Sequence, residues 1–186
     1  GHSDILGGVL TTNDDELDER LRFLLKATGG VPSSFDNWIL LRSTKTLGLR
    51  YQKSSDNATE LAHWLADQDI LDRVIYPGLK NHPQHEIALK QQKTPNGEVI
   101  FGNMISIDVG TIEARDRFLE RLDVFTLAES LGGVESLVCV PYDMTHAAIP
   151  VKAKLELGIT ETLIRLSIGI EDVGDLKADL QNALKD

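Results

Sequence analysis

The sequence predicts an α/β protein, because segments with strand periodicity alternate along the chain with segments of helical periodicity. Apolar runs at residues 104–109, 136–140 and 163–170 are typical of strands, and helical stripes separate and follow them. The 186 residues can bury one good core or parts of two domains. Since the texture changes after about residue 66, we expect a domain boundary between residues 1–66 and 67–186.

The first part of the chain is expected to be mostly helical. A short strand is predicted over residues 4–11, which contain a glycine pair. Asn13 can cap a helix that carries a leucine stripe and ends at Gly29. A long and bent helical segment then begins at Ser34 and continues to about Leu65, as in helices that link two domains.

The second part mixes strands and helices. Its last helix is predicted by the apolar stripe Val173, Leu176, Leu180 and Leu184. The expected elements are a strand at 74–76, a helix at 82–92, a loop at 94–97, a strand at 104–109, a helix at 111–122, strands at 136–140 and 163–170, and the closing helix.

Composition limits the possible partners and the cellular compartment. Proteins that bind nucleic acid or anionic membranes need clustered lysine and arginine, whereas this chain has a net charge of −10. Cys139 is the lone cysteine, which excludes an internal disulfide and fits a reducing compartment. No apolar stretch approaches the roughly 20 residues that span a bilayer, and the first residues lack the features of a signal peptide. We therefore expect a cytoplasmic protein that binds neither nucleic acid nor membrane.

Two motifs resemble functional sites without meeting their requirements. His85 and Glu86 begin like a zinc-binding HExxH, but Leu89 stands where the second histidine would be, so we expect no metal. Ser43-Thr44-Lys45 superficially resembles a cofactor-binding motif. It lies within a predicted helix, where we expect Lys45 to be solvated or paired with a neighbour.

Arg165 is the one arginine embedded in a run that otherwise has the pattern of a buried strand. Alternation places Leu163, Arg165 and Ser167 on one face of that strand. A buried guanidinium is costly unless an anion meets it, and its planar fork suits a carboxylate. Two alternatives remain open from these residues, a bound carboxylate substrate and an internal salt bridge to Asp or Glu, and the second is the commoner.

An ordered series of motifs runs from the first residue to the end of the chain. The most specific part is the stretch from Glu129 to Leu137. The series comprises Gly1-His2-Ser3-Asp4 with Gly7-Gly8, Val31-Pro32-Ser33-Ser34-Phe35-Asp36, Lys45-Thr46-Leu47 with Arg50, Tyr76-Pro77-Gly78-Leu79, Phe125 to Leu137, Met144-Thr145-His146 and Leu163 to Asp172.

With this series the chain strongly resembles the C-terminal half of the cystathionine γ-lyase and γ-synthase family, pyridoxal-phosphate (PLP) enzymes of cysteine and methionine metabolism. The resemblance implies a fold-type-I architecture. Residues 1–66 would complete the large cofactor-binding domain and link it to the small C-terminal domain at 67–186. It also implies a homotetramer built as a dimer of dimers, with the N-terminal half of the same enzyme as a partner.

The resemblance further implies that the cofactor is held mainly by the N-terminal half. In the family the lysine that forms the Schiff base lies a few residues before the segment matched by Gly1-His2-Ser3-Asp4. We therefore expect no catalytic residue in this chain, no certain cofactor-binding residue, and little activity of the chain alone.

Substrate-binding roles are implied at five positions. Arg165 matches the arginine that binds the substrate α-carboxylate, and the backbone of Leu131 would lie beside that carboxylate. Ser130 matches a serine that helps to position the lysine and the substrate. Glu129 matches the distal end of the pocket, where a carboxylate attracts the far ammonium of cystathionine, and Thr145 matches the pocket wall.

These matches favour cleavage of cystathionine, a small amino-acid substrate, to cysteine, 2-oxobutanoate and ammonia. Glu129 favours chemistry at the γ-carbon. The alternatives are cystathionine γ-synthase, another PLP lyase of cysteine and methionine metabolism, and a non-catalytic fragment or subunit with a structural role.

Overall fold

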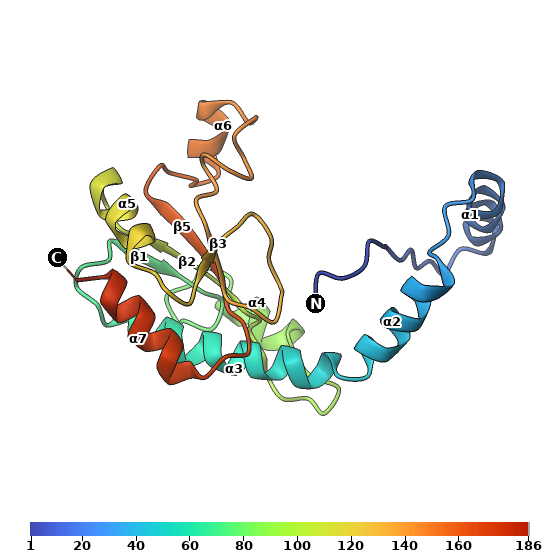
Figure 1. Ribbon diagram of the computed structural model, residues 1–186, viewed down its shortest axis with the longest axis horizontal. Helices are drawn as coiled ribbons and strands as arrows, with labels where there is room; N and C mark the ends of the chain where they lie inside the picture. Colours follow the sequence, from blue (N-terminus) through green and yellow to red (C-terminus); the bar gives the residue numbers. More distant parts are fainter. Residues whose placement is uncertain (186) are drawn as a thin grey trace. The chain divides into compact units, whose positions relative to one another are not determined.

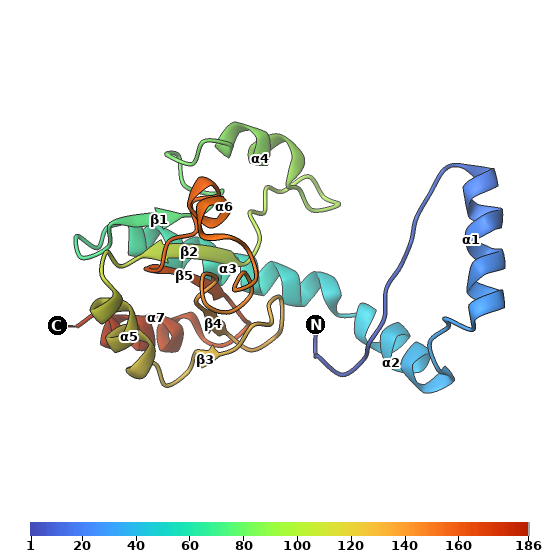
Figure 2. The ribbon, with the colours of Figure 1, turned by 90° about the horizontal axis from the view of Figure 1, so that it is seen from above.

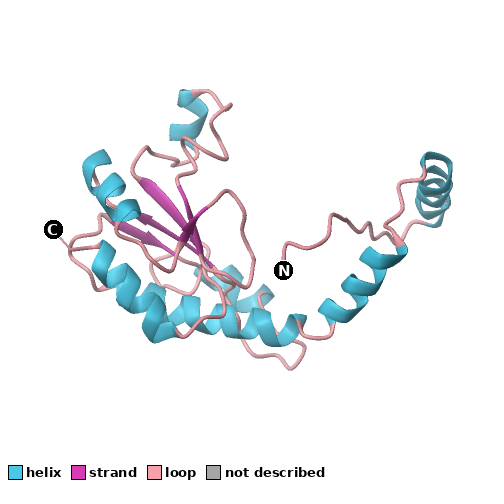
Figure 3. Cartoon of the chain, viewed as in Figure 1, coloured by secondary structure: helices cyan, strands magenta, loops and turns pink. Residues whose placement is uncertain are grey.

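The computed structural model describes residues 1–185 and divides into two compact units. The first unit comprises residues 1–48, and the second begins at Leu49. The division lies earlier than the boundary expected near residue 66, because Ala58, Leu61 and Leu65 of the linking helix belong to the core of the second unit. The helices are α1 (Asp15–Thr28), α2 (Ser34–Thr44), α3 (Leu47–Ala66), α4 (His85–Gln91), α5 (Ile112–Glu120), α6 (Val151–Glu156) and α7 (Val173–Ala183) (Figure 3).

The first unit is built on two capped helices that bury nothing. The Asp14 carboxylate accepts a hydrogen bond of 2.9 Å from the Leu17 amide and begins α1. Gly29 ends α1 in the left-handed conformation at φ 68°, which glycine adopts without steric cost. Neither α1 nor α2 contains a buried residue, and Trp38 is 58% exposed. This unit therefore has no hydrophobic core of its own.

The strand predicted over residues 4–11 is wrong, because the structure has no strand there. A strand needs a partner for its backbone N–H and C=O groups, and no segment within residues 1–185 pairs with this one. Leu6, Val9 and Leu10 are 96%, 86% and 77% exposed. The apolar residues of this segment therefore did not suffice to predict a strand, because they do not show whether another strand can pair with it.

The second unit contains a five-stranded sheet in the order β1-β2-β5-β4-β3. Its central strand β5 pairs antiparallel with β2 and β4, and β3 pairs parallel with β4. The central strand β5 is buried at four of its five residues, as its apolar run predicted. The strands are β1 (Arg73–Ile75), β2 (Met104–Asp108), β3 (Thr126–Leu127), β4 (Leu137–Cys139) and β5 (Leu163–Ser167).

One face of the sheet carries the core. Helices α3 and α7 lie against this face, on the same side of the sheet in both views (Figures 1 and 2). They contact each other as well, since the Lys177 ammonium lies 5.4 Å from the centre of the Trp64 ring. No helix within the described residues is long and apolar enough to cross a bilayer.

A carboxylate on α7 fixes the chain that leads to the candidate site. Asp179 is buried and accepts hydrogen bonds of 2.8–3.0 Å from the main-chain amides of Asp123, Val124 and Phe125. These amides immediately precede β3, whose far end leads to Glu129. The path of that segment is therefore set by a charge-assisted contact from the opposite layer.

The carboxyl group of Asp108, at the end of β2, makes the stability of the fold depend on pH. Burial alone would raise the pKa of Asp108, but hydrogen bonds from Thr162, Gly110 and Thr160 and the charge of Arg73 outweigh it and lower the pKa. A carboxyl group with a depressed pKa stabilises the fold above its unfolded pKa of about 4, and this contribution is lost as the pH falls through the folded value.

We therefore expect Asp108→Asn to lower the free energy of unfolding near neutral pH, with a smaller difference from wild type below about pH 4. Urea unfolding at several pH values measures this. Asp69→Asn is the control, since Asp69 is exposed. An equal loss of stability at neutral and acid pH would show that the ionisation of Asp108 does not matter.

Candidate carboxylate-binding site

The predicted alternation along β5 is confirmed. Ile164 and Leu166 are fully buried in the core, while Arg165 and Ser167 point to the other face of the sheet. Arg165 is half-buried, and its direct cross-strand neighbours are Ser106 on β2 and Cys139 on β4. The central strand thus places one guanidinium in the middle of the face that the core helices do not cover.

Arg165 contacts main-chain oxygens and leaves donors unused. Its Nη2 donates to the carbonyl oxygen of Glu129 at 2.8 Å and approaches that of Ser130 at 3.5 Å. No ion pair among residues 1–185 includes Arg165, so the internal salt bridge is not formed there. Nε and Nη1 make no hydrogen bond within the described chain, and they are not fully buried. Each of these two nitrogens can pair with the second Nη2 hydrogen to form one fork, which can grip a carboxylate from outside the chain.

The segment from Glu129 to Gly132 lies along β5 on the same face as Arg165. The Gly132 amide donates to the Ser167 hydroxyl at 2.8 Å, and Gly132 has φ 71°, which favours glycine. Arg165 and Ser167 thus hold the two ends of this segment. The side chains of Glu129, Ser130 and Leu131 are exposed, Leu131 at 54%. The structure therefore brings four of the five expected residues together.

Thr145 is placed apart from these four. It is exposed, and its hydroxyl contacts Nδ1 of the next residue, His146, at 2.7 Å. Within residues 1–185 it makes no hydrogen bond to Arg165 or to the Glu129 segment. Its chain segment nevertheless follows directly on β4, whose last residue Cys139 neighbours Arg165.

Cys139 is a neighbour of Arg165 that the sequence patterns did not associate with the site. Burial raises the pKa of the Cys139 thiol, an effect that the Arg165 charge partly offsets and the Glu129 carboxylate reinforces. A thiol with a raised pKa is protonated at neutral pH and is a poor nucleophile. The register of β4 against β5 was the only signal for this neighbour, and it is visible only in the folded sheet.

Helix N-termini can bind the phosphate of a cofactor through free amides. Side chains of this chain already cap α1, α2, α5 and α7, whereas no side-chain hydrogen bond caps α4 or α6. The buried lysine among the described residues is Lys154, and its ammonium donates to the Tyr142 carbonyl at 2.8 Å. Within the described residues, no three His, Cys, Asp or Glu side chains gather as metal ligands.

A hollow of about 390 Å³ lies elsewhere on the second unit. Its carboxylates would repel a substrate carboxylate. It is lined by Asp123, Val124, Glu171, Asp175, Ala178, Asp179 and Asn182.

Comparison with known proteins shows the family to which the chain belongs. The family profile described as "Cys/Met metabolism PLP-dependent enzyme" matches residues 1–185. The chain belongs to this family of PLP-dependent enzymes. The relatives described below are named as cystathionine lyases and synthases, so the resemblance seen in the sequence is confirmed. The fold is that of the PLP-dependent cystathionine enzymes.

Individual relatives are named for three different activities. Cystathionine γ-lyase of Bacillus subtilis is 49% identical over 185 residues, 100% of this chain and 47% of that protein. Cystathionine β-lyase of Coxiella burnetii is 47% identical over 99% of this chain and 46% of that protein. The solved cystathionine γ-synthase of Xanthomonas oryzae in complex with cystathionine is 42% identical, with a TM-score of 0.91, over 99% of this chain and 46% of that one. The chain thus spans about half the length of the relatives that it matches.

Proposed function

We propose that this chain is the C-terminal portion of a PLP-dependent γ-lyase that cleaves cystathionine to cysteine, 2-oxobutanoate and ammonia. The observation that carries the proposal is Arg165, a central-strand guanidinium whose Nε and Nη1 have no partner within the described residues. An α-carboxylate is the anion that all amino-acid substrates share, and a planar fork fits it with two hydrogen bonds.

The roles of this chain are binding and orientation. In this family the cofactor supplies the electron sink for the reaction. Arg165 holds the substrate carboxylate and so fixes the direction of the bonds at Cα, which lowers the entropy cost of reaching the reactive geometry. The Leu131 backbone and the Ser130 side chain border the same carboxylate. Because Arg165 binds the Glu129 and Ser130 carbonyls, one side chain both shapes this border and grips the substrate.

Glu129 is proposed to select the substrate. Arg165, Glu129, Ser130 and Leu131 form what we call the Arg165 cluster. The Glu129 side chain is exposed there, so it can meet the distal part of a long substrate. Cystathionine carries an ammonium there, which a carboxylate attracts. Methionine has only an apolar methyl group at the corresponding end.

Cystathionine γ-synthase is the second candidate. It is supported by the solved γ-synthase complex with cystathionine, whose backbone matches this chain with a TM-score of 0.91. The proposal also includes the N-terminal half of the same enzyme as partner, a tetramer built as a dimer of dimers, and a cytoplasmic location. The exposed apolar side chains of α1 and α2 support such a partner, because 67% of Phe23 and 69% of Leu41 lie open.

The test uses the complete enzyme that contains this chain, purified with PLP. A γ-lyase releases 2-oxobutanoate and cysteine from cystathionine, a β-lyase releases pyruvate and homocysteine, and a γ-synthase forms cystathionine from cysteine and an activated homoserine. Chromatography of the keto acids distinguishes these outcomes. Borohydride reduction followed by peptide mapping should find the cofactor on a lysine outside residues 1–186. Pyruvate as the main product, or a cofactor adduct within this chain, would contradict the proposal.

We expect Glu129→Val to depress turnover of cystathionine and to spare or improve turnover of methionine. The variant loses the charge contact with the distal ammonium and eases desolvation of an apolar tail. The ratio of kcat/KM for the two substrates measures the effect. Glu135→Val is a control, since Glu135 is also an exposed glutamate of the same motif. An equal fall for both substrates in Glu129→Val would remove its role in selection.

A further inference from the structure

A long excursion of the chain joins two neighbouring strands at the candidate site. β4 ends at Cys139 and β5 begins at Leu163, and the strands pair antiparallel, so the ends of the excursion lie close together. We refer to residues 140–162 as the β4–β5 connection. It carries Thr145 and helix α6, which stands away from the sheet in Figure 1. Residues that bind ligands are often carried by connections that a rigid scaffold positions.

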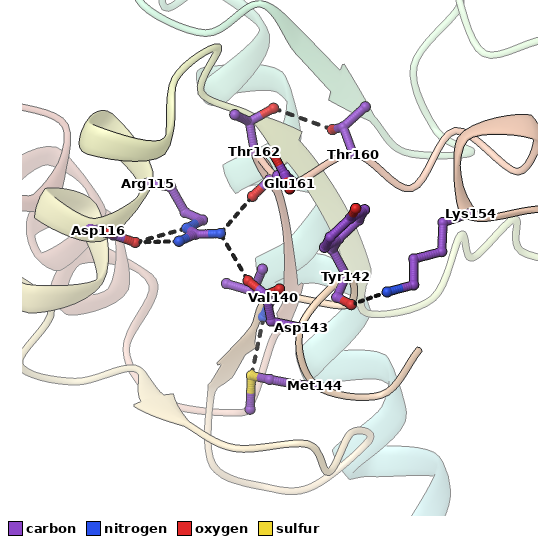
Figure 4. Close-up of polar contacts among 10 residues, drawn as sticks. All are labelled: Arg115, Asp116, Val140, Tyr142, Asp143, Met144, Lys154, Thr160, Glu161 and Thr162. Atoms are coloured by element: carbon purple, nitrogen blue, oxygen red, sulfur yellow. Dashed lines mark hydrogen bonds and ion pairs between the residues drawn. The ribbon is translucent and has the colours of Figure 1, made fainter. Parts of the chain in front are cut away.

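Arg115 on α5 ties both ends of the β4–β5 connection. Its side chain is only 13% exposed. Nη1 donates to the Asp143 carboxylate at 3.0 Å near the beginning and to the Glu161 carbonyl at 2.8 Å near the end, while Nε donates to Asp116 at 2.8 Å (Figure 4). One guanidinium thus bridges three separate parts of the chain, with geometry that a lysine cannot reproduce.

Lys154 secures the connection from inside. It is 4% exposed, and its ammonium donates to the Tyr142 carbonyl at 2.8 Å and lies 4.0 Å from the centre of the Tyr142 ring. No ion pair among residues 1–185 includes Lys154. A buried ammonium is costly, so its only compensation inside the described chain is the carbonyl and the ring. The Val140 amide also contacts the Met144 sulfur at 3.4 Å, which shapes the turn before Thr145.

We propose that Arg115 is a positioning residue for substrate binding, because it fixes the β4–β5 connection, which leaves the sheet at Cys139 next to Arg165 and carries Thr145. This inference rests on the proposed function, which makes the Arg165 cluster the substrate site. Arg115 acts through Asp143, two residues before Thr145, and through Glu161, and it does not touch the substrate. Lys154 holds the same connection at Tyr142, one residue earlier than Asp143.

The test compares Arg115→Lys and Asp143→Asn with wild type in the complete, PLP-loaded enzyme. Each change loosens the start of the connection, so KM for cystathionine should rise about threefold to tenfold while kcat stays within about twofold. Because both residues act through one contact, the double variant should raise KM no further than Arg115→Lys alone. Lys152→Ala is the matched control, since Lys152 lies on α6 in the same connection, is 90% exposed and, among residues 1–185, pairs with Glu156 alone.

An unchanged KM in both Arg115→Lys and Asp143→Asn would overturn the inference, and so would a fall in kcat at unchanged KM. If Arg115→Lys does not fold, Asp143→Asn decides alone, because its carboxylate is 57% exposed and its loss leaves the Glu161 contact in place. Failure of the proposed function is distinguishable. In that case Arg165→Lys would leave the kinetics unchanged, whatever the Arg115 variants do.

Discussion

Replacing Arg165 by lysine should lower kcat/KM for cystathionine at least about tenfold in the complete enzyme. Lysine keeps the positive charge but loses the planar fork that meets both carboxylate oxygens. Each hydrogen bond to a charged group is worth roughly 1.5–3 kcal/mol, and about 1.4 kcal/mol corresponds to a factor of ten. The loss should fall on every amino-acid substrate alike, because all share the α-carboxylate.

The cofactor should remain bound in Arg165→Lys, since the role proposed for this side chain is to hold the substrate, and its contact within the chain is with the Glu129 carbonyl. The absorbance of bound PLP measures its retention, and steady-state kinetics with two substrates measure the loss. Arg22→Lys is the control, because Arg22 lies on α1 and pairs there with Asp18. Unchanged kinetics in Arg165→Lys would remove Arg165 from the site, and equal loss in Arg22→Lys would indicate a general effect of replacing an arginine.

Much of the second unit could be predicted from local patterns. The alternation of apolar and polar residues from Leu163 to Ser167 gave both the strand and the direction of Arg165, because a strand has a period of two. The helix predicted over residues 111–122 is α5, and the Thr111 hydroxyl caps it by accepting a hydrogen bond from the Ala114 amide. The bend expected in the long helical segment is the break between α2 and α3 at Lys45 and Thr46.

The contacts that build the site could not be predicted in the same way. Arg165 binds main-chain carbonyls 35 and 36 positions away, and a carbonyl carries no signal in the residue type. Arg115 contacts Asp143 and Glu161, which are 28 and 46 positions away and join only when the strands pair. The strand predicted over residues 4–11 was wrong for a similar reason, because the local pattern does not show whether another segment can pair with it.

Gly169 offers the sharpest test of how the end of β5 is held. A Cβ built on Gly169 would lie 2.8 Å from the main-chain carbon of Glu135 and would collide with the Val134 carbonyl oxygen. Neither neighbour can move freely, because the Ile170 amide donates to that same oxygen at 2.9 Å. The Gly169 carbonyl accepts a hydrogen bond of 3.1 Å from the side-chain Nδ2 of the buried Asn57, which ties this turn to α3.

We therefore expect Gly169→Ala to lower the free energy of unfolding of the complete enzyme by about 3 kcal/mol, at the upper end of the usual cost of overpacking. Gly48→Ala is the matched control, since it lies within α3 and its added Cβ would meet nothing within 4 Å. Alanine suits a helix better than glycine, so this control should be neutral or stabilising by up to about 1 kcal/mol. Chemical unfolding of both variants gives the comparison. Equal stability of Gly169→Ala and wild type would mean that the Val134–Glu135 backbone can shift, and the segment that crosses β5 from Glu129 would then be less rigidly held than its hydrogen bonds indicate.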